Sequence, residues 1–365
     1  MKEVLNSIEA NPVLQPMTTH DHEQVVFCQD SKTGLRAIIA IHNTSLGPAL
    51  GGTRMWTYNN ELEALNDVLR LSRGMSYKAS ISGLNLGGGK AVILGDSRSQ
   101  KTEALMRRFG KFVDSLGGKY ITAEDVGMSP KDMEYIHMET EHVSGVPEHL
   151  GGGGDPSPVT AYGVYMGMKA SAKRLWAKDS LTGKKILVQG AGHVGQYLID
   201  YLLKEDAHVM VADIFQDKLK AVTSKHPKVE IVAPEDVYKT PVDIYAPCAL
   251  GATVNDDTID QLTCEIIAGA ANNQLANEEV HGQLLMKKGV IYAPDFLINA
   301  GGLINCYSEL HGYNRERAFK DAEEIYNTTL RIFDYSEEHK MPSYKAANII
   351  AEERINAIAH INTKR

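Results

Sequence analysis

The sequence predicts an α/β protein of two domains, one of them built on a doubly wound parallel sheet. Three observations lead to this prediction. The chain has 365 residues, enough for two domains of ordinary size. Short apolar strands alternate with amphipathic helices along most of its length. A stretch rich in glycine and proline, GGGGDPSP at 151–158, interrupts that alternation. We therefore expect residues 1–150 and about 330–365 to form one domain, and residues 151–329 the other.

The first 150 residues contain signals for both strands and helices. Residues 24–42 predict two strands joined by a turn, because QVVFCQD and LRAIIAIH flank the polar segment SKTG. Residues 61–73 and 101–116 predict helices, since their apolar side chains recur at helical spacing. The segments AVILGD at 91–96 and KYITAEDVG at 119–127 predict further strands. This half of the chain is therefore expected to be an α/β domain.

The alternation becomes strict in the second half of the chain. A helix is expected at about 160–176, and the last stretch, 314–361, is expected to be mostly helical with a break at MPS. Between them, apolar strands separated by helices predict a parallel sheet with helices on both faces. The predicted strands are KKILVQG, HVMVADI, VDIYAPCAL, CEIIAGAAN and GVIYAPDFLINAGG, the last at 289–302.

Composition and charge exclude several classes of function. The net charge of −8 argues against non-specific binding of nucleic acid or of an anionic membrane. No segment approaches the roughly 20 apolar residues that span a bilayer, and the N-terminus has no long apolar signal region. The histidines of THDHE lack a second cluster of ligands, so we expect no metal site. Four scattered cysteines indicate reduced thiols in a cytoplasmic protein: Cys28, Cys248, Cys264 and Cys306.

The segment VQGAGHVG at 188–195 has the spacing of a dinucleotide-binding turn. It follows an apolar strand and opens an amphipathic helix, which makes a glycine turn without a cofactor a poor alternative. Gly190 would form the turn, Gly192 would let the backbone approach a pyrophosphate, and Gly195 would let helix and strand pack closely. Asp213 ends the next strand, where a carboxylate binds a ribose 2′-hydroxyl and repels a 2′-phosphate. The predicted NAD site comprises Gly190, Ala191, Gly192, His193, Val194, Gly195, Gln196 and Asp213.

A second glycine cluster stands at 83–92, in GLNLGGGKAV, where three successive glycines precede Lys90. Such a run is costly to order and occurs where the backbone approaches another group closely or adopts positive φ. We expect a tight turn that holds Lys90 beside the apolar segment AVIL, where loss of water would lower the pKa of its amine. Taken alone, the stretch is more typical of an exposed lysine on a turn.

Together these motifs resemble, nearly end to end, the amino-acid dehydrogenases that act on glutamate, leucine, phenylalanine and valine, and most closely the leucine dehydrogenases. The resemblance implies a Rossmann NAD-binding domain at 151–329 and an N-terminal α/β domain for substrate binding and oligomerisation. It implies a reversible reaction in which an L-amino acid, NAD and water give a 2-oxo acid, ammonia and NADH. It also implies a homo-oligomer, often an octamer. The motifs are LGPALGGTRMW, RGMSYKAS, GLNLGGGKAVI, YITAEDVG, PSPVTAYGVY, YAPCALGA, AGAANNQLA and YAPDFLINAGGLIN.

The resemblance also assigns roles to single residues. Lys90 would be the catalytic lysine, acting while neutral as a general base on water, and Asp125 would assist proton transfer at the substrate amine. Lys78 would hold the substrate carboxylate, and its charge would help to lower the pKa of Lys90. The remaining polar residues so assigned are Asn299 at the substrate, and Asn272 and Thr160 near the nicotinamide.

Side-chain specificity is implied by four further positions. Glutamate dehydrogenases carry a lysine where this chain has Leu50, so a glutamate side chain would leave a buried carboxylate unpaired. Typical leucine dehydrogenases carry valines where this chain has Leu303 and Cys306. This difference leaves the ranking of leucine, isoleucine and valine as substrates open. Asp155 stands where an asparagine is frequent, and we assign it no role. The implied apolar pocket comprises Leu50, Ala123, Leu303 and Cys306.

Two alternatives remain at this stage. An aromatic amino-acid dehydrogenase, acting on phenylalanine or tryptophan, would need a roomier pocket than Leu50 and Leu303 suggest. A non-catalytic NAD-binding homologue would have lost at least one of Lys78, Lys90 and Asp125, and the chain retains all three.

Overall fold

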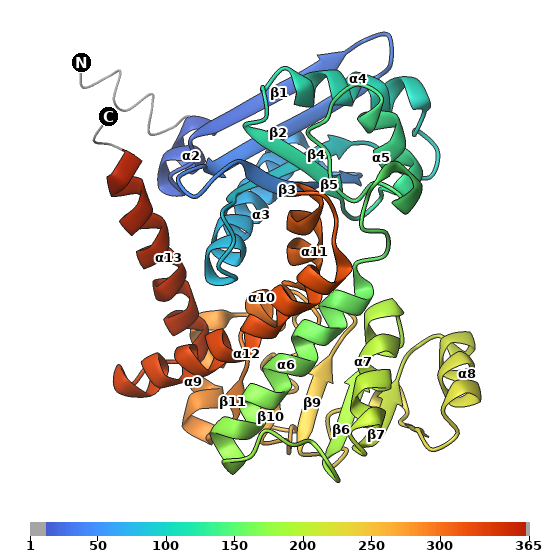
Figure 1. Cartoon of the computed structure of the whole chain (residues 1–365), viewed down its shortest axis with the longest axis vertical. Helices are drawn as coiled ribbons and strands as arrows, with labels where there is room; N and C mark the ends of the chain where they lie inside the picture. Colours follow the sequence, from blue (N-terminus) through green and yellow to red (C-terminus); the bar gives the residue numbers. More distant parts are fainter. Residues whose placement is uncertain (1–11, 363–365) are drawn as a thin grey trace. The chain divides into compact units, whose positions relative to one another are not determined.

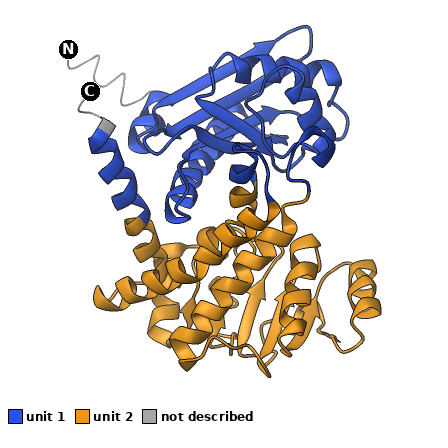
Figure 2. Cartoon of the chain, in the orientation of Figure 1, with its two compact units in different colours: residues 1–154, 306–314, 351–365 blue, residues 155–305, 315–350 orange. Residues whose placement is uncertain are grey.

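The computed structural model describes residues 12–362, which form parts of two compact units (Figures 1 and 2). Unit 1 contains Met1–Gly154, Cys306–Asn314 and Ala351–Arg365, and unit 2 contains Asp155–Asn305 and Arg315–Ile350. The predicted α/β fold class is confirmed. Within the described residues, no helix is both long and apolar enough to cross a membrane.

The later domain boundary differs from the expected one near residue 330. Helix α12 (Arg315–Glu338) runs without interruption through that position and packs along α6 (Ser157–Trp176). A continuous helix that buries one face against a neighbour belongs with that neighbour over its whole length. Unit 2 therefore extends to Ile350, and only the end of α13 (Ser343–Asn362) joins unit 1.

Unit 1 is built on a five-stranded mixed sheet with the order β1-β2-β4-β3-β5. Strand β2 is antiparallel to β1 and β4, whereas β3 is parallel to β4 and β5. The strands predicted at 24–42 and 119–127 are confirmed, but β3 is not predicted, because Gly51 and Gly52 interrupt its apolar pattern. The strands are β1 (Gln24–Asp30), β2 (Leu35–Asn43), β3 (Ala49–Trp56), β4 (Gly87–Leu94) and β5 (Tyr120–Glu124).

The prediction of a tight turn before Lys90 is wrong. Gly87, Gly88 and Gly89 are the first three residues of β4, and none of them has positive φ. A Cβ added to Gly88 would stand 2.1 Å from the amide nitrogen of Ser76, and one added to Gly87 would stand 2.0 Å from the carbonyl oxygen of Asn43. The glycines therefore allow close packing of neighbouring backbone, which side chains would prevent.

Helices cover both faces of this sheet. On one face α3 packs over an apolar cluster that includes Leu65, Leu69 and Val92, and on the other α4 and α5 pack over a larger cluster around Phe109 and Tyr120. Helix α3 continues eight residues past its predicted end at 73, because Gly74 is tolerated inside it. The helices of this part are α2 (Leu14–Thr19), α3 (Glu61–Ile81), α4 (Glu103–Asp114), α5 (Pro130–His137) and the 3-10 turn η1 (Glu148–Leu150).

Unit 2 is a six-stranded, wholly parallel sheet with the order β11-β10-β9-β6-β7-β8. The chain runs outward from β6 in one direction and from β9 in the other, so the doubly wound sheet is confirmed and its order reverses between β6 and β9. The strands are β6 (Lys185–Gln189), β7 (His208–Ala212), β8 (Glu230–Ile231), β9 (Ile244–Pro247), β10 (Ile266–Ile267) and β11 (Ile291–Tyr292).

The long strand predicted at 289–302 is wrong beyond Tyr292. Pro294, which cannot donate to a sheet, ends the strand, and two helices follow. The second of these, α11, begins in unit 2 and ends in unit 1. The remaining helices are α7 (His193–Lys204), α8 (Gln216–Lys225), η2 (Pro234–Asp236), α9 (Glu278–Lys288), α10 (Asp295–Ile298) and α11 (Gly301–Glu309).

Candidate active site

The centre of the candidate site in unit 1 is an ion pair between Lys90 and Asp125. The Lys90 Nζ lies 2.7 Å from Asp125 Oδ2, and Lys90 is only 6% exposed. Burial lowers the pKa of the Lys90 amine, although the charge of Asp125 opposes this effect. Burial by itself raises the pKa of Asp125, but the positive charges of Lys90 and Arg54 outweigh it and hold that pKa below its usual range. The arrangement can hold a proton between an amine and a carboxylate.

Strand alternation explains why Lys90 points where it does. Ala91 and Ile93 belong to the cluster beneath α4 and α5, so Lys90 and Val92 face α3. The same rule places Leu50 and Arg54 of β3 on that face, because Met55 lies in the opposite cluster. The structure therefore brings these side chains together on one face of the sheet, next to the carboxyl end of β5.

Arg54 is a site residue that the sequence analysis missed. Its Nε donates to Asp125 Oδ2 at 3.1 Å, and its Nη1 donates to Asp67 Oδ2 on α3 at 2.9 Å. The hydroxyl of Tyr58 donates to the same Asp67 oxygen at 2.8 Å. An arginine inside a buried strand was the available signal, but it carries weight only once β3 is recognised as a strand.

Lys78 lies half-buried in the last turn of α3. The helix is seated on β4 at Gly88, where a side chain would collide with Ser76. Lys78 follows Ser76 by two residues and Lys90 follows Gly88 by two residues. The positions of both lysines thus depend on the same close contact between α3 and β4.

The apolar residues assigned to the substrate pocket occupy two elements of the sheet and one helix. Leu50 of β3 pairs with Gly88 of β4 and Ile121 of β5. Ala123 lies two residues beyond Ile121 in β5, so its side chain is on the same face of the sheet. Both are buried. Cys306 lies on α11, where its carbonyl oxygen accepts a hydrogen bond of 3.3 Å from Ser144, a residue bonded through its backbone to Thr122 of β5. Burial raises the pKa of the Cys306 thiol to about 12, so it behaves as a small neutral group. Leu303 is buried one helical turn earlier.

The glycine fingerprint in unit 2 has the geometry of a pyrophosphate turn. Gly190 adopts a φ of +118°, and a Cβ there would stand 2.9 Å from Ala249, which follows β9. A Cβ at Gly195 would stand 2.0 Å from the Gly190 carbonyl oxygen, so α7 packs directly on the end of β6. Gly192, the N-cap of α7, would meet nothing within 4 Å. The turn is therefore closed on the protein side and open at Gly192, at the point where the strand order reverses.

Asp213 follows β7 and is bound to this turn. One carboxylate oxygen accepts from the Ala191 amide at 2.8 Å, and the other accepts from the Phe215 amide at 2.9 Å. Gln196 donates to the Ala191 carbonyl oxygen at 2.9 Å, whereas His193 is exposed and Val194 is half-buried. The carboxylate is thus fixed beside the fingerprint loop.

Three of the predicted polar residues of unit 2, Asn272, Asn299 and Thr160, lie beside the short helices α10 and α11. The Asn299 side chain donates to Asn272 Oδ1 at 2.8 Å, so the structure brings these two residues together. Thr160, in the first turn of α6, bonds to the Pro156 carbonyl oxygen at 3.0 Å. Gly301 lets the start of α11 lie against that turn, since a Cβ would stand 2.2 Å from the Val159 carbonyl oxygen.

The residues of unit 2 fit a bound dinucleotide. The open space at Gly192 lies at the N-terminus of α7, where backbone N–H groups and the helix dipole favour a pyrophosphate. The fixed carboxylate of Asp213 suits a ribose diol and repels a 2′-phosphate. The observations therefore agree with NAD as the cofactor.

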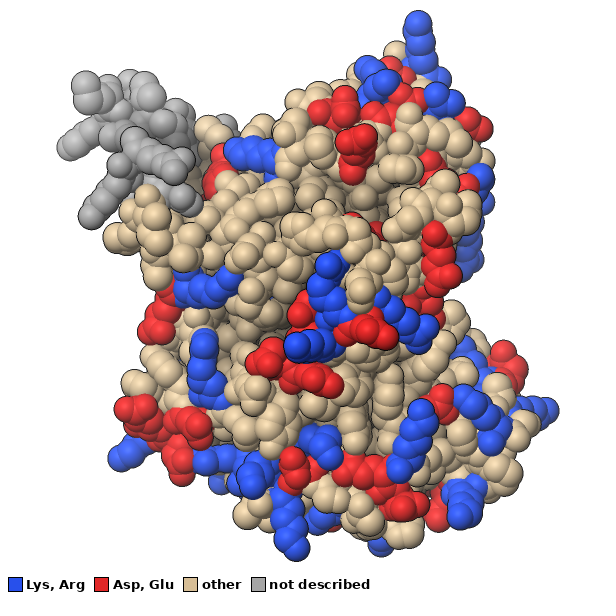
Figure 3. All heavy atoms as spheres, in the orientation of Figure 1, with Lys and Arg blue, Asp and Glu red and all other residues tan. Residues whose placement is uncertain are grey.

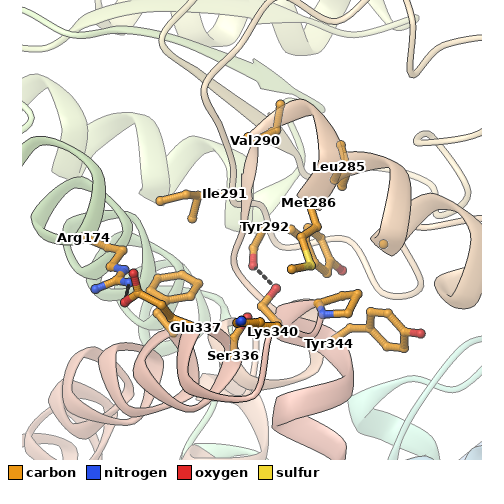
Figure 4. A pocket seen from close by; sticks show the side chains of 15 residues that line it. Arg174, Leu285, Met286, Val290, Ile291, Tyr292, Ser336, Glu337, Lys340 and Tyr344 are labelled. Carbon is orange, nitrogen blue, oxygen red and sulfur yellow. Dashed lines mark hydrogen bonds and ion pairs between the residues drawn. The ribbon is translucent and has the colours of Figure 1, made fainter.

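Two further features belong to the surface of the molecule. On the face seen in Figure 3, acidic and basic side chains are intermixed over both units. A cavity of about 620 Å³ in unit 2 lies between α9, β11 and the connection from α12 to α13 (Figure 4). Its lining includes Arg174, Met286, Tyr292 and Tyr344 and contains none of the predicted site residues.

Comparison with known proteins identifies the family. Residues 22–142 match the profile described as Glu/Leu/Phe/Val dehydrogenase, dimerisation domain, and residues 151–215 and 210–362 match that described as Glutamate/Leucine/Phenylalanine/Valine dehydrogenase. The leucine dehydrogenase of Thermoactinomyces intermedius is 54% identical over 339 residues, which cover 93% of this chain and 92% of that protein. The valine dehydrogenase of Streptomyces coelicolor is 48% identical over 336 residues, or 92% of each chain.

A solved structure supports the same assignment. The crystal structure of L-tryptophan dehydrogenase from Nostoc punctiforme has a TM-score of 0.83 and 45% sequence identity, and covers 94% of this chain and 99% of that one. The resemblance inferred from the motifs is confirmed. A match to the family's dimerisation domain further supports an oligomeric enzyme with a small-molecule substrate. The chain belongs to the glutamate/leucine/phenylalanine/valine dehydrogenase family and is an NAD-dependent amino-acid dehydrogenase.

Proposed function

We propose that this chain catalyses the reversible, NAD-dependent oxidative deamination of branched-chain L-amino acids, namely leucine, isoleucine and valine, to 2-oxo acids and ammonia. The observation that carries the proposal is the buried pair of Lys90 and Asp125, which shares a sheet face with Leu50 and Ala123. A proton-transfer pair beside an apolar surface suits an amino acid with an aliphatic side chain.

In the proposed mechanism, three residues of unit 1 have separate roles in substrate binding and proton transfer. Lys78 binds the substrate carboxylate, and Asp125 accepts and returns the protons of the amine. NAD supplies the hydride acceptor for the substrate Cα. Lys90, acting in its neutral form, takes a proton from the water that attacks the oxidised carbon, and burial favours that form because it lowers the pKa of the amine. Activity should accordingly rise as the pH rises through the pKa of Lys90.

The proposed specificity depends on Leu50, which stands where glutamate dehydrogenases carry a lysine. Leu50 is 2% exposed, and its side chain offers neither a charge nor a hydrogen-bond donor to a substrate carboxylate placed against it. The neutral thiol of Cys306 likewise offers no charge. A branched aliphatic side chain loses only apolar contact with water there, which is favourable.

A second candidate substrate is an aromatic amino acid, favoured by the relationship to the tryptophan dehydrogenase of Nostoc punctiforme at 48% identity over 345 residues. An indole ring would need a smaller side chain than Leu50 in the pocket. Leu50→Ala is the variant that tests this, since it enlarges the pocket without adding a charge. It should raise activity on tryptophan relative to leucine.

The test is NADH formation by the purified enzyme with a panel of leucine, isoleucine, valine, glutamate, phenylalanine and tryptophan. The branched-chain substrates should have the highest kcat/KM, and glutamate should be nearly inactive. Turnover of glutamate equal to that of leucine would overturn the proposal. A preference for tryptophan in the unmodified enzyme would favour the second candidate.

The proposal includes a homo-octamer that works in the cytoplasm. The octamer is supported by resemblance to the family, and light scattering on the purified enzyme would test it. A reducing compartment is supported by the cysteines, since all four lie in the described residues and are free thiols.

A further inference from the structure

Arg54 connects the Lys90–Asp125 pair to a second carboxylate. Its guanidinium donates through Nε to Asp125 Oδ2 at 3.1 Å and through Nη1 to Asp67 Oδ2 at 2.9 Å. Lys90 Nζ contacts the same Asp125 oxygen, at 2.7 Å. Two cations thus converge on a single oxygen atom, and the second carboxylate holds the outer end of one of them.

The outer end of Arg54 is held firmly. Asp67 also accepts hydrogen bonds from the Tyr58 hydroxyl at 2.8 Å and from Arg70 Nη2 at 3.0 Å. The side chains of Arg54 and Asp67 are 23% and 17% exposed, so both contacts are largely sheltered from water. A planar guanidinium bound at two edges loses its freedom to rotate. Arg54 can therefore fix the orientation of the Asp125 carboxylate.

The charges around Lys90 come from three elements. Asp125 after β5 favours its ammonium form, as does Asp67 on α3, whereas Arg54 on β3 disfavours it. Tyr58 and Arg70 reach the group only through Asp67. Lys78, also on α3, is a further cation of this unit. Arg54 is the cation in direct contact with the carboxylate that Lys90 binds.

We propose that Arg54, clamped by Asp67, is a positioning residue for the catalytic pair: it orients Asp125 against Lys90 and, by its charge, favours the neutral amine of Lys90. This inference rests on the proposed function, because it explains how a buried lysine that is paired with a carboxylate can still act as a base. Without Arg54, Asp125 would hold Lys90 in its charged form more strongly.

Three variants separate the charge of Arg54 from its shape. In a plot of kcat/KM for leucine against pH, the acid limb is the range over which activity rises as Lys90 loses its proton. Arg54→Gln removes the positive charge, so this limb should move to higher pH by about one unit. Asp67→Asn keeps an acceptor for Arg54 but removes a negative charge, so that limb should move to lower pH by a smaller amount. Arg54→Lys keeps the charge but cannot hydrogen-bond to Asp125 and Asp67 through two sides of a planar group. The limb should therefore stay near its original pH while kcat falls.

A second measurement needs no turnover. Competitive acetylation of the resting enzyme with acetic anhydride, followed by mass spectrometry of the Lys90 peptide, reports the pH at which this amine loses its proton. The reactivity midpoint should shift upward in Arg54→Gln and downward in Asp67→Asn. Shifts in the same direction, or none in either folded variant, would overturn the inference.

The two proposals fail in different ways. An unmodified enzyme that binds NAD but oxidises no amino acid contradicts the proposed function, while the acetylation midpoints still decide the role of Arg54. Should Arg54→Gln fail to fold, Asp67→Asn and Arg54→Lys decide it, since a purely structural role predicts loss of stability without the downward shift. Thermal melting of each variant provides the control for folding.

Discussion

Two clusters of glycine precede functional groups in this protein, and the structure uses them in different ways. In unit 1, Gly87, Gly88 and Gly89 lie in an extended strand, and neighbouring atoms fill the space that their side chains would occupy. In unit 2, Gly190 adopts positive φ and Gly192 faces open space at the start of α7. The first cluster serves packing of the protein against itself, and the second leaves room for a ligand. Similar sequence signals therefore have different physical causes.

The largest expected effect follows from removing the group that the first cluster presents. Lys90→Ala should lower kcat by about 100- to 10,000-fold, since it removes the proposed general base. Lys78→Ala should instead raise KM for the amino acid steeply, with a smaller fall in kcat. Steady-state kinetics, with NAD binding measured separately, checks both. Affinity for NAD should change little, because the fingerprint lies in unit 2. If Lys90→Ala kept most of its kcat while KM rose, the two lysines would exchange roles.

Substitution of one glycine from each cluster tests the comparison directly. Gly88→Ala places a methyl group 2.1 Å from the Ser76 amide nitrogen, so α3 must shift and the free energy of unfolding should fall by about 1–3 kcal/mol or more. Gly192→Ala, the matched control, meets no atom and has an ordinary φ of −70°. Its stability should stay within about 0.5 kcal/mol of the original, while the Kd for NAD rises. Urea unfolding and NAD titration distinguish these outcomes, and equal stability losses would remove the distinction.

Acid should weaken the packing of α3 against the sheet of unit 1. His42 bonds through Nδ1 to Ser76 Oγ at 2.7 Å, and His22 bonds to Ser72 Oγ at 2.8 Å. Burial lowers the pKa of both imidazoles to about 4, and the charge of Arg73 adds to the effect. The unfolded chain binds protons near pH 6.5 and the folded chain does not until about pH 4, so stability falls as the pH drops between these values.

The loss at pH 5 should be about 1–2 kcal/mol for each imidazole. Urea unfolding at pH 7 and pH 5 measures it. His42→Gln, whose amide can still bond to Ser76, should show a smaller dependence on pH. Identical stabilities of the unmodified protein at the two pH values would contradict the prediction.

The smallest expected effect concerns the cofactor that the second cluster is proposed to bind. With its carboxylate held by the Ala191 amide, Asp213 should favour NAD over NADP by at least about tenfold in kcat/KM, equivalent to about 1.4 kcal/mol. Asp213→Ser, which removes the charge, should reduce this preference. Equal use of both cofactors by the unmodified enzyme would show that Asp213 does not face the ribose.

Much of the fold was predictable because its signals are local. Apolar strands alternating with helices predicted the parallel sheet of unit 2, and helical spacing predicted α3 and α4. Prediction failed where a signal was mixed. Strand β3 was missed because Gly51 and Gly52 lack side chains to carry a pattern, and the segment after Tyr292 was read as a strand because its apolar residues are shared by strands and buried helices.

For the site, the motifs indicated Lys90, Asp125 and the glycine fingerprint, and the structure places Lys90 against Asp125 and Asp213 against Ala191. Their roles stay predictions. Arg54 and Asp67 were not indicated, because a single arginine or aspartate in a sequence carries no sign of its partner. Their importance depends on a contact between β3 and α3.

The sequence by itself determined the alternation of strands and helices in unit 2, apart from β8 and the segment after Tyr292, and the position of the glycine turn before α7. These depend on neighbours within a few residues, such as a glycine spacing or an apolar run. Only the tertiary structure decided that the glycine run before Lys90 is a strand, that Arg54 bridges two carboxylates, and that His42 supports Ser76. Each depends on groups far apart in the chain whose distance is set by packing, and packing is not encoded in any short segment.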